Sequence, residues 1–203
     1  MTHQKTSSCI FTSMLTIISG REIMETATIP VHAKHFDREK ALEVILYIAE
    51  NLTAPTLHGI SKILYLADKQ HLQDFGRLIC GDQYIAMEYG PVPSAIYDMM
   101  KVAAGRKSID IDWDELINDA FKVTQGRNIK PIRRANIGFL AESETSCISR
   151  TVAEFGGKTF GELTDITHDA AWNEASENQF IPIDAIAKTL PNANDVIAYL
   201  RAH

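Results

Sequence analysis

The chain has few cysteines, and they follow no pattern of a disulfide framework or a metal site. Three occur in 203 residues, at positions 9, 80 and 147, and none belongs to a C-x-x-C pair. An odd count with wide spacing is typical of a reducing compartment. The chain also lacks an H-E-x-x-H segment, a Walker loop and a dinucleotide-binding fingerprint. The sequence therefore predicts no metal, no cofactor and a cytoplasmic location.

Long hydrophobic runs are also missing. The most apolar stretch near the start, CIFTSMLTII at residues 9–18, is interrupted by Thr12, Ser13 and Thr16. A helix that crosses a bilayer needs about 20 apolar residues, and no small-residue cleavage site follows this stretch. We expect no membrane segment. Residues 1–35 are predicted to form a poorly ordered or loosely docked extension, and Met24 competes with Met1 as the true start.

Positive charge is scarce. The chain has 20 lysines and arginines against 26 aspartates and glutamates, for a net charge of -6. Broad binding to nucleic acid needs a basic surface, so this composition makes it an unfavoured function. A local cluster of Arg127, Lys130, Arg133 and Arg134 keeps a DNA-binding regulator open as an alternative, although a solvated face explains it more simply. An acidic surface suits a basic protein partner.

The remaining composition is that of an ordinary globular protein, with 45% hydrophobic and 23% charged residues. Its length suits one domain with a sizeable core. Apolar spacing, capping residues and glycine stops predict helices at most positions. The expected helices follow Asp37, span Leu57–Asp74, follow Pro93 as far as Gly105, lie within 109–119, and follow Ser143, Thr159, Asp169 and Asn192 or Asn194.

Strand patterns are short. Residues 84–89 read as one strand, and Gly90-Pro91-Val92-Pro93 as a rigid extended entry to the next helix, because each proline restricts the residue before it. Residues 121–123 and 129–132 flank a turn and predict a β-hairpin. The expected fold is mainly α with a small β element (α+β), as a single compact helical domain over residues 36–203.

Aromatic residues surround the glycine–proline segment and form the candidate binding site. Aromatic side chains are favoured at protein interfaces because they bury a large area with few rotatable bonds. Packing inside the fold is the alternative for every one of them. Asp82 is expected to shape the preceding loop, and His168 and Trp172, four residues apart, to stack on one helix face. The candidate residues are Asp82, Tyr84, Tyr89, Gly90, Pro91, Val92, Tyr97, His168 and Trp172.

The same segments resemble a known family. The order Ile63-Leu64-Tyr65-Leu66-Ala67-Asp68, Gly76-Arg77, Gly81-Asp82, Tyr84 and Tyr89-Gly90-Pro91-Val92, followed by Tyr97, is similar to the SocA-like antitoxin family, or Panacea domain. Thr167-His168 and Ala171-Trp172 resemble its later His-and-Trp segment. The resemblance extends over about 37–177 and implies that residues 36–203 form a SocA-like domain.

The resemblance implies a non-enzymatic antitoxin of a bacterial or phage toxin–antitoxin system. Such a protein neutralises a cognate toxin by direct binding or, as an adaptor, delivers it to the ClpXP protease through ClpX. Which toxin is bound and whether the chain forms a homo-oligomer stay open. A second alternative, from the residues alone, is a hydrolase or metal enzyme using Asp68, His71, Asp82 and His168, which requires these groups to converge in one pocket.

Overall fold

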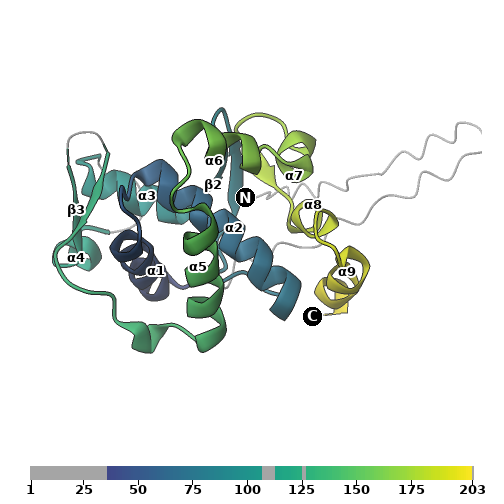
Figure 1. Ribbon diagram of the computed structural model, residues 1–203, viewed down its shortest axis with the longest axis horizontal. Coiled ribbons are helices and arrows are strands. Elements are labelled where there is room, and N and C mark those ends of the chain that lie inside the picture. The colour runs from purple at the N-terminus through teal and green to yellow at the C-terminus, as the bar shows by residue number, and fades with distance from the viewer. Residues whose placement is uncertain (1–35, 107–112, 125–126, 203) are drawn as a thin grey trace, which may run out of the picture.

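A computed structural model describes residues 36–106, 113–124 and 127–202, and the expected extension at 1–35 lies outside this part of the chain. The described part is mainly helical with small antiparallel sheets, as the sequence predicts (Figure 1). Helix α2 runs through the middle, between α1 and α5 on one side and α7, α8 and α9 on the other (Figure 1). Within those ranges, no helix combines the length and the apolar content that crossing a membrane demands.

Side-chain caps and a glycine set boundaries of helices α1 (Arg38–Asn51) and α2 (Leu57–Phe75). The Asp37 carboxylate accepts a hydrogen bond from the Lys40 amide at 2.9 Å, and Thr56 caps α2 by accepting from Gly59. Gly76 ends α2 in the left-handed region, at φ 70°. The sequence predicted all three boundaries.

A hairpin follows α2 and differs from the prediction of one strand and an extended entry. β1 (Tyr84–Met87) pairs antiparallel with β2 (Gly90–Pro93), so the glycine–proline segment is itself a strand. Glu88 and Tyr89 form the turn. The short strand β5 (Phe180–Ile181) pairs with the other edge of β1, which gives the order β2-β1-β5.

Helix α3 (Ser94–Ala103) leaves β2 directly, with Pro93 at its N-cap position. Helix α4 (Trp113–Ile117) precedes the second hairpin, formed by β3 (Phe121–Val123) and β4 (Ile129–Pro131), as predicted. The 3-10 turn η2 (Ile137–Phe139) then leads to α5 (Glu142–Phe155).

The C-terminal third is a series of short helices. Thr159 and Glu162 form the predicted capping box of α6 (Phe160–Thr167), and Asp169 caps α7 (Ala170–Glu174). Helices α8 (Ile183–Lys188) and α9 (Ala193–Ala202) follow β5. Helix α5 begins at Glu142 with Ala141 as its N-cap, so the expectation that Ser143 caps it was wrong. The Ser143 hydroxyl instead lies 3.1 Å from His71 Nε2.

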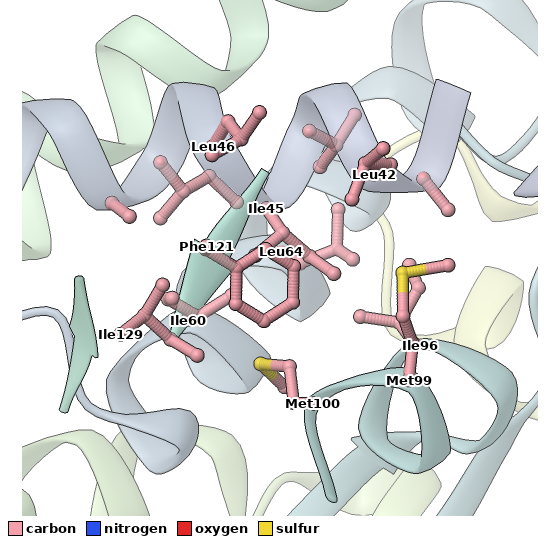
Figure 2. Packing of buried hydrophobic residues seen from close by; sticks show 14 of the residues in the cluster. Leu42, Ile45, Leu46, Ile60, Leu64, Ile96, Met99, Met100, Phe121 and Ile129 are labelled. Atoms are coloured by element: carbon pink, nitrogen blue, oxygen red, sulfur yellow. The ribbon is translucent and has the colours of Figure 1, made fainter. Parts of the chain in front are cut away.

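Two apolar clusters meet at α2. The first joins α1, one side of α2, α3, α5 and the second hairpin, and Figure 2 shows its centre, where Ile60 and Leu64 of α2 lie among side chains from α1, α3, β3 and β4. The second cluster places Tyr65 and Leu72 of α2 against β1, α7, β5, α8 and α9. Helix α2 is therefore shared between both clusters, which explains its apolar character on several faces.

Two buried carboxylates tie distant segments together. Glu144 of α5 is fully buried and accepts from Lys40 at 2.9 Å and from Arg77 at 2.8 Å. Burial on its own would raise the pKa of Glu144. The hydrogen bond from the Ala141 amide and the two cations outweigh burial and lower this pKa. Glu43 of α1 binds the Arg133 guanidinium through both oxygens, at 2.6 and 2.9 Å.

Candidate functional site

Gly90 begins β2 directly after the turn, and the backbone geometry there requires a glycine. Gly90 has φ 95°, where a side chain is strained. A Cβ atom there would lie 2.8 Å from Lys62 Nζ and 2.9 Å from Thr167 Oγ1. The turn thus lies directly against α2 and α6.

Lys62 is the fully buried cation beneath this turn. Its ammonium group donates a hydrogen bond to the Pro91 carbonyl at 2.9 Å. In the described part of the chain, no carboxylate lies within salt-bridge distance of it. Burial lowers the pKa of Lys62 to about 7. This lysine fastens β2 to the middle of α2.

His58 lies one helical turn before Lys62, and its ring packs against the aromatic residues of the site. Burial, with the Lys62 charge second, lowers the pKa of His58 to about 4, so the imidazole is neutral at physiological pH. Its Nε2 lies 3.2 Å from Thr164 Oγ1. The ring stacks on Phe160 with 3.9 Å between centroids, and Phe160 meets the Tyr89 ring edge-on at 5.4 Å.

His168 and Trp172 stack in parallel on the other side of the turn. Their centroids lie 3.7 Å apart with an interplanar angle of 2°, and the Trp172 indole N–H donates to the Met87 carbonyl at 3.0 Å. The prediction that both lie on one helix was wrong: His168 is the residue after α6, and α7 begins at Ala170. Burial and then the Lys62 charge lower the pKa of His168, and its Nε2 is buried without a hydrogen-bond partner.

Asp169 holds this second pair in place from α7. Its carboxylate accepts from the Tyr65 hydroxyl at 3.0 Å and from Lys69 at 2.6 Å, both on α2. It also accepts from the amides of Ala171 and Trp172. The start of α7, and with it the Trp172 ring, is therefore fixed to α2.

These two groups of stacked rings, His58, Tyr89 and Phe160 in one and His168 and Trp172 in the other, are together called the hairpin surface. Tyr89 is 52% and Phe160 53% exposed, so their rings are available to a partner. A shallow pocket of about 410 Å³ opens beside Trp172. The pocket is lined by Ala86, Glu88, Trp172, Asn173, Ala175 and Glu177.

Other predicted site residues make contacts within the fold. The buried Tyr84 hydroxyl donates to Asp68 at 2.7 Å. Asp82 is buried and caps α3 from outside the helix, since its carboxylate accepts from Ala95 at 3.1 Å and from Ile96 at 2.9 Å. Pro91 is buried and Val92 half-buried in β2. The half-buried Tyr97 lies beneath the Lys101 ammonium, 4.9 Å from its ring centroid and separate from the hairpin surface.

The four residues of the hydrolase alternative bind separate partners. Asp68 accepts from the Ile79 amide and Tyr84, and burial raises its pKa to about 7. His71 is held between the Arg77 carbonyl and Ser143. Neither of the two described pockets is lined by Asp68, His71, Asp82 or His168, and in the described part no three His, Cys, Asp or Glu residues form a metal-binding group. The geometry gives no support to an enzyme built on these residues.

The basic cluster near the second hairpin is partly neutralised within the fold. Arg133 pairs with Glu43, while Lys130 and Arg134 are exposed. Arg127 adopts φ 63°, and its carbonyl accepts from the Leu57 amide at 3.0 Å. The cluster therefore offers fewer free cations than its sequence suggests.

Sequence reasoning missed His58, Lys62 and Phe160 as members of the site. His58 and Lys62 are four residues apart on a helix, so they share a face, and this spacing of two basic residues in the apolar first half of the helix was the available signal. Phe160 begins α6 directly after its cap, a position that gives no hint of partners 100 residues away.

Comparison with known proteins assigns the chain to a family. Residues 60–173, which cover the hairpin, α5, α6 and most of α7, match the family described as Antitoxin SocA-like, Panacea domain. No curated protein and no solved structure matches the chain. The matched region contains every residue of the hairpin surface except His58 and spans more than half of the sequence. The chain therefore belongs to the SocA-like antitoxin family, as a Panacea-domain protein.

Proposed function

We propose that this protein is a non-enzymatic antitoxin that neutralises a cognate toxin by direct binding through the hairpin surface. The observation that carries the proposal is the pair of half-exposed rings, Tyr89 and Phe160, held edge-to-face above buried contacts. Exposed aromatics on a rigid base are common energetic centres of protein interfaces, because they lose little conformational freedom on binding.

The base beneath these rings supports a preformed interface. Lys62 fixes the turn to α2, His58 stacks under Phe160, and Asp169 fixes α7. A partner would meet a surface that needs little rearrangement, which favours a shape-complementary complex.

We further propose that residues 36–203 act as one antitoxin domain. Both α1, before the matched region, and α8 and α9, after it, contribute buried side chains to the two clusters that share α2. Residues 1–35 are proposed as an extension. The buried thiols of Cys80 and Cys147, whose pKa values burial raises, are compatible with the proposed cytoplasmic location.

Co-expression with the product of the adjacent gene tests the proposal. We expect the neighbour alone to arrest growth, and this chain to restore growth and co-purify with it. The double variant Tyr89→Ala/Phe160→Ala should keep the fold, measured by circular dichroism and melting temperature, yet bind at least about 30-fold more weakly, because each ring is proposed to be an energetic centre.

The matched control is Ile137→Ala/Phe139→Ala, which removes two exposed apolar side chains from η2. It should rescue growth like the wild type. Rescue without a complex, dependent on ClpXP, would replace direct neutralisation with protease delivery. Unchanged toxin binding by the Tyr89/Phe160 variant would show that the interface lies elsewhere.

A further inference from the structure

The two segments that carry most of the hairpin surface, residues 84–93 and 160–179, are strongly acidic. Residues 84–93 contribute Glu88, and residues 160–179 contribute five more carboxylates, which gives six acidic residues and no lysine or arginine in the two segments. The six are Glu88, Glu162, Asp165, Asp169, Glu174 and Glu177.

Half of these carboxylates are neutralised by cations from other segments. Lys158 pairs with Glu162, Lys69 with Asp169, and Lys188 with Glu174. For Glu88, Asp165 and Glu177, the described part of the chain supplies no cation within salt-bridge distance. The uncompensated charge therefore lies in the hairpin turn, on α6 and in the loop after α7.

Two of the unpaired carboxylates line the pocket beside Trp172. Glu88 comes from the β1–β2 turn and Glu177 from the loop after α7, so they reach the pocket from two separate segments, and Trp172 also lines it. The indole N–H donates to the Met87 carbonyl, and the ring stacks on the parallel His168 ring, whose pKa is lowered by burial. The pocket is thus lined by an aromatic residue held in place and by two acidic residues without a cation partner among the described residues, of which Glu88 accepts a hydrogen bond from the Tyr89 hydroxyl.

We infer that this pocket receives an arginine side chain of the partner protein. A guanidinium group is planar, stacks on an indole ring and donates up to five hydrogen bonds in a fork that matches carboxylates. It is also weakly hydrated, so it leaves water more readily than an ammonium group does. The inference rests on the proposed function and names the chemistry of the partner: a basic toxin with an exposed arginine at its interface, complementary to a chain of net charge -6.

The pocket is tested first without the toxin, on the full-length protein. The chain has two tryptophans, Trp113 and Trp172, and Trp113 is buried against Phe36. Indole N–H resonances in a ¹⁵N-labelled sample therefore give one reporter in the pocket and one internal control. N-acetyl-arginine amide is the probe, and N-acetyl-citrulline amide, which keeps the shape without the charge, is its matched comparison.

We expect the arginine probe to shift the Trp172 resonance saturably, with dissociation in the millimolar range, and to leave Trp113 unchanged. Glu88→Gln/Glu177→Gln should weaken this binding at least about fivefold. Equal shifts from the citrulline probe, or no saturable shift of Trp172, would overturn the inference.

The second test uses the cognate toxin. Glu88→Gln/Glu177→Gln should weaken the complex at least about tenfold, with most of the loss in the dissociation rate. Glu39→Gln/Glu115→Gln, which removes two exposed carboxylates from α1 and α4, changes the net charge equally and should bind like the wild type. Equal loss in both variants would indicate nonspecific charge attraction and would refute the pocket.

The two proposals fail in different ways. If the toxin binds and neither glutamine variant weakens it, the arginine pocket is wrong and the antitoxin function stands. If the arginine probe binds at Trp172 but the neighbouring gene product never forms a complex, the pocket is supported and the proposed function is wrong.

Discussion

The buried Lys62 gives the sharpest test of how this site is built. Burial destabilises its charged form, so the free energy of unfolding should depend on pH. Burial lowers its pKa from 10.5 to about 7. Between these two values, the unfolded chain binds a proton that the folded protein has released. The free energy of unfolding therefore rises with pH across this window, by about 1.4 kcal/mol per unit at the steepest.

The size of the effect follows from the two pKa values. From pH 6.5 to pH 9.5, the Lys62 contribution to the free energy of unfolding should increase by about 3 kcal/mol. Lys62→Met removes the titrating group and the hydrogen bond to Pro91, and the lost bond adds a constant offset of about 1 kcal/mol. All other titrating groups remain in both proteins, so their effects largely cancel in the difference.

Urea unfolding followed by circular dichroism at pH 6.5, 7.5, 8.5 and 9.5 measures that difference. We expect the wild type to gain about 3 kcal/mol relative to Lys62→Met over the series. Ile63→Val is the control, since it alters the neighbouring core residue without a titrating group and should give a constant difference of about 1 kcal/mol. If the free energy of unfolding changed with pH in parallel for the wild type and Lys62→Met, the idea that the folded protein lowers the pKa of Lys62 to about 7 would be refuted.

Three further variants test other parts of the site by urea unfolding. Gly90→Ala should lose at least about 2 kcal/mol, because the new Cβ meets Lys62 and Thr167 at a strained φ; a loss below about 0.5 kcal/mol would contradict the close packing of the turn. Asp82→Ala should cost about 1–3 kcal/mol, because two amides of α3 lose their acceptor, and a neutral result would mean that water caps α3 equally well. Asp68 has its pKa raised from 3.8 to about 7, so the unfolded chain ionises first and the wild type should lose about 3 kcal/mol relative to Asp68→Asn from pH 4.5 to 7.5; a constant difference would show that this carboxyl ionises in the folded protein as it does in the unfolded chain.

The helices were predictable because their signals are local. Asp37, Thr56 and Gly76 mark boundaries through interactions that span only three or four residues. The strand β2 was missed because two prolines argue against a strand, and nothing local shows that β1 and α2 hold both its sides. The first turn of α5 was misread for a similar reason: His71, on another helix, engages Ser143.

The geometry of the candidate site was only partly predictable, because burial could not be read from the sequence. Tyr84 and Tyr89 look alike in sequence, yet the first is buried against Asp68 and the second is half exposed. The stacking of His168 with Trp172 was expected, although the chain achieves it across a break between two helices. Phe160 could not be identified, because its contacts with His58 and Tyr89 join segments about 70 to 100 residues apart.

The second apolar cluster also constrains the order in which the protein is assembled during synthesis. Seven of its eleven buried members come from residues 171–196, and the other four come from residues 65–86. At about 5–20 residues per second, a ribosome needs roughly 6 to 20 seconds to pass from residue 86 to residue 196. Until then Tyr65 and Leu72 lack their covering helices, and a truncated product keeps them in water, where chaperones and proteases recognise such surface. The second cluster can therefore close only after residues 171–196 have been synthesised.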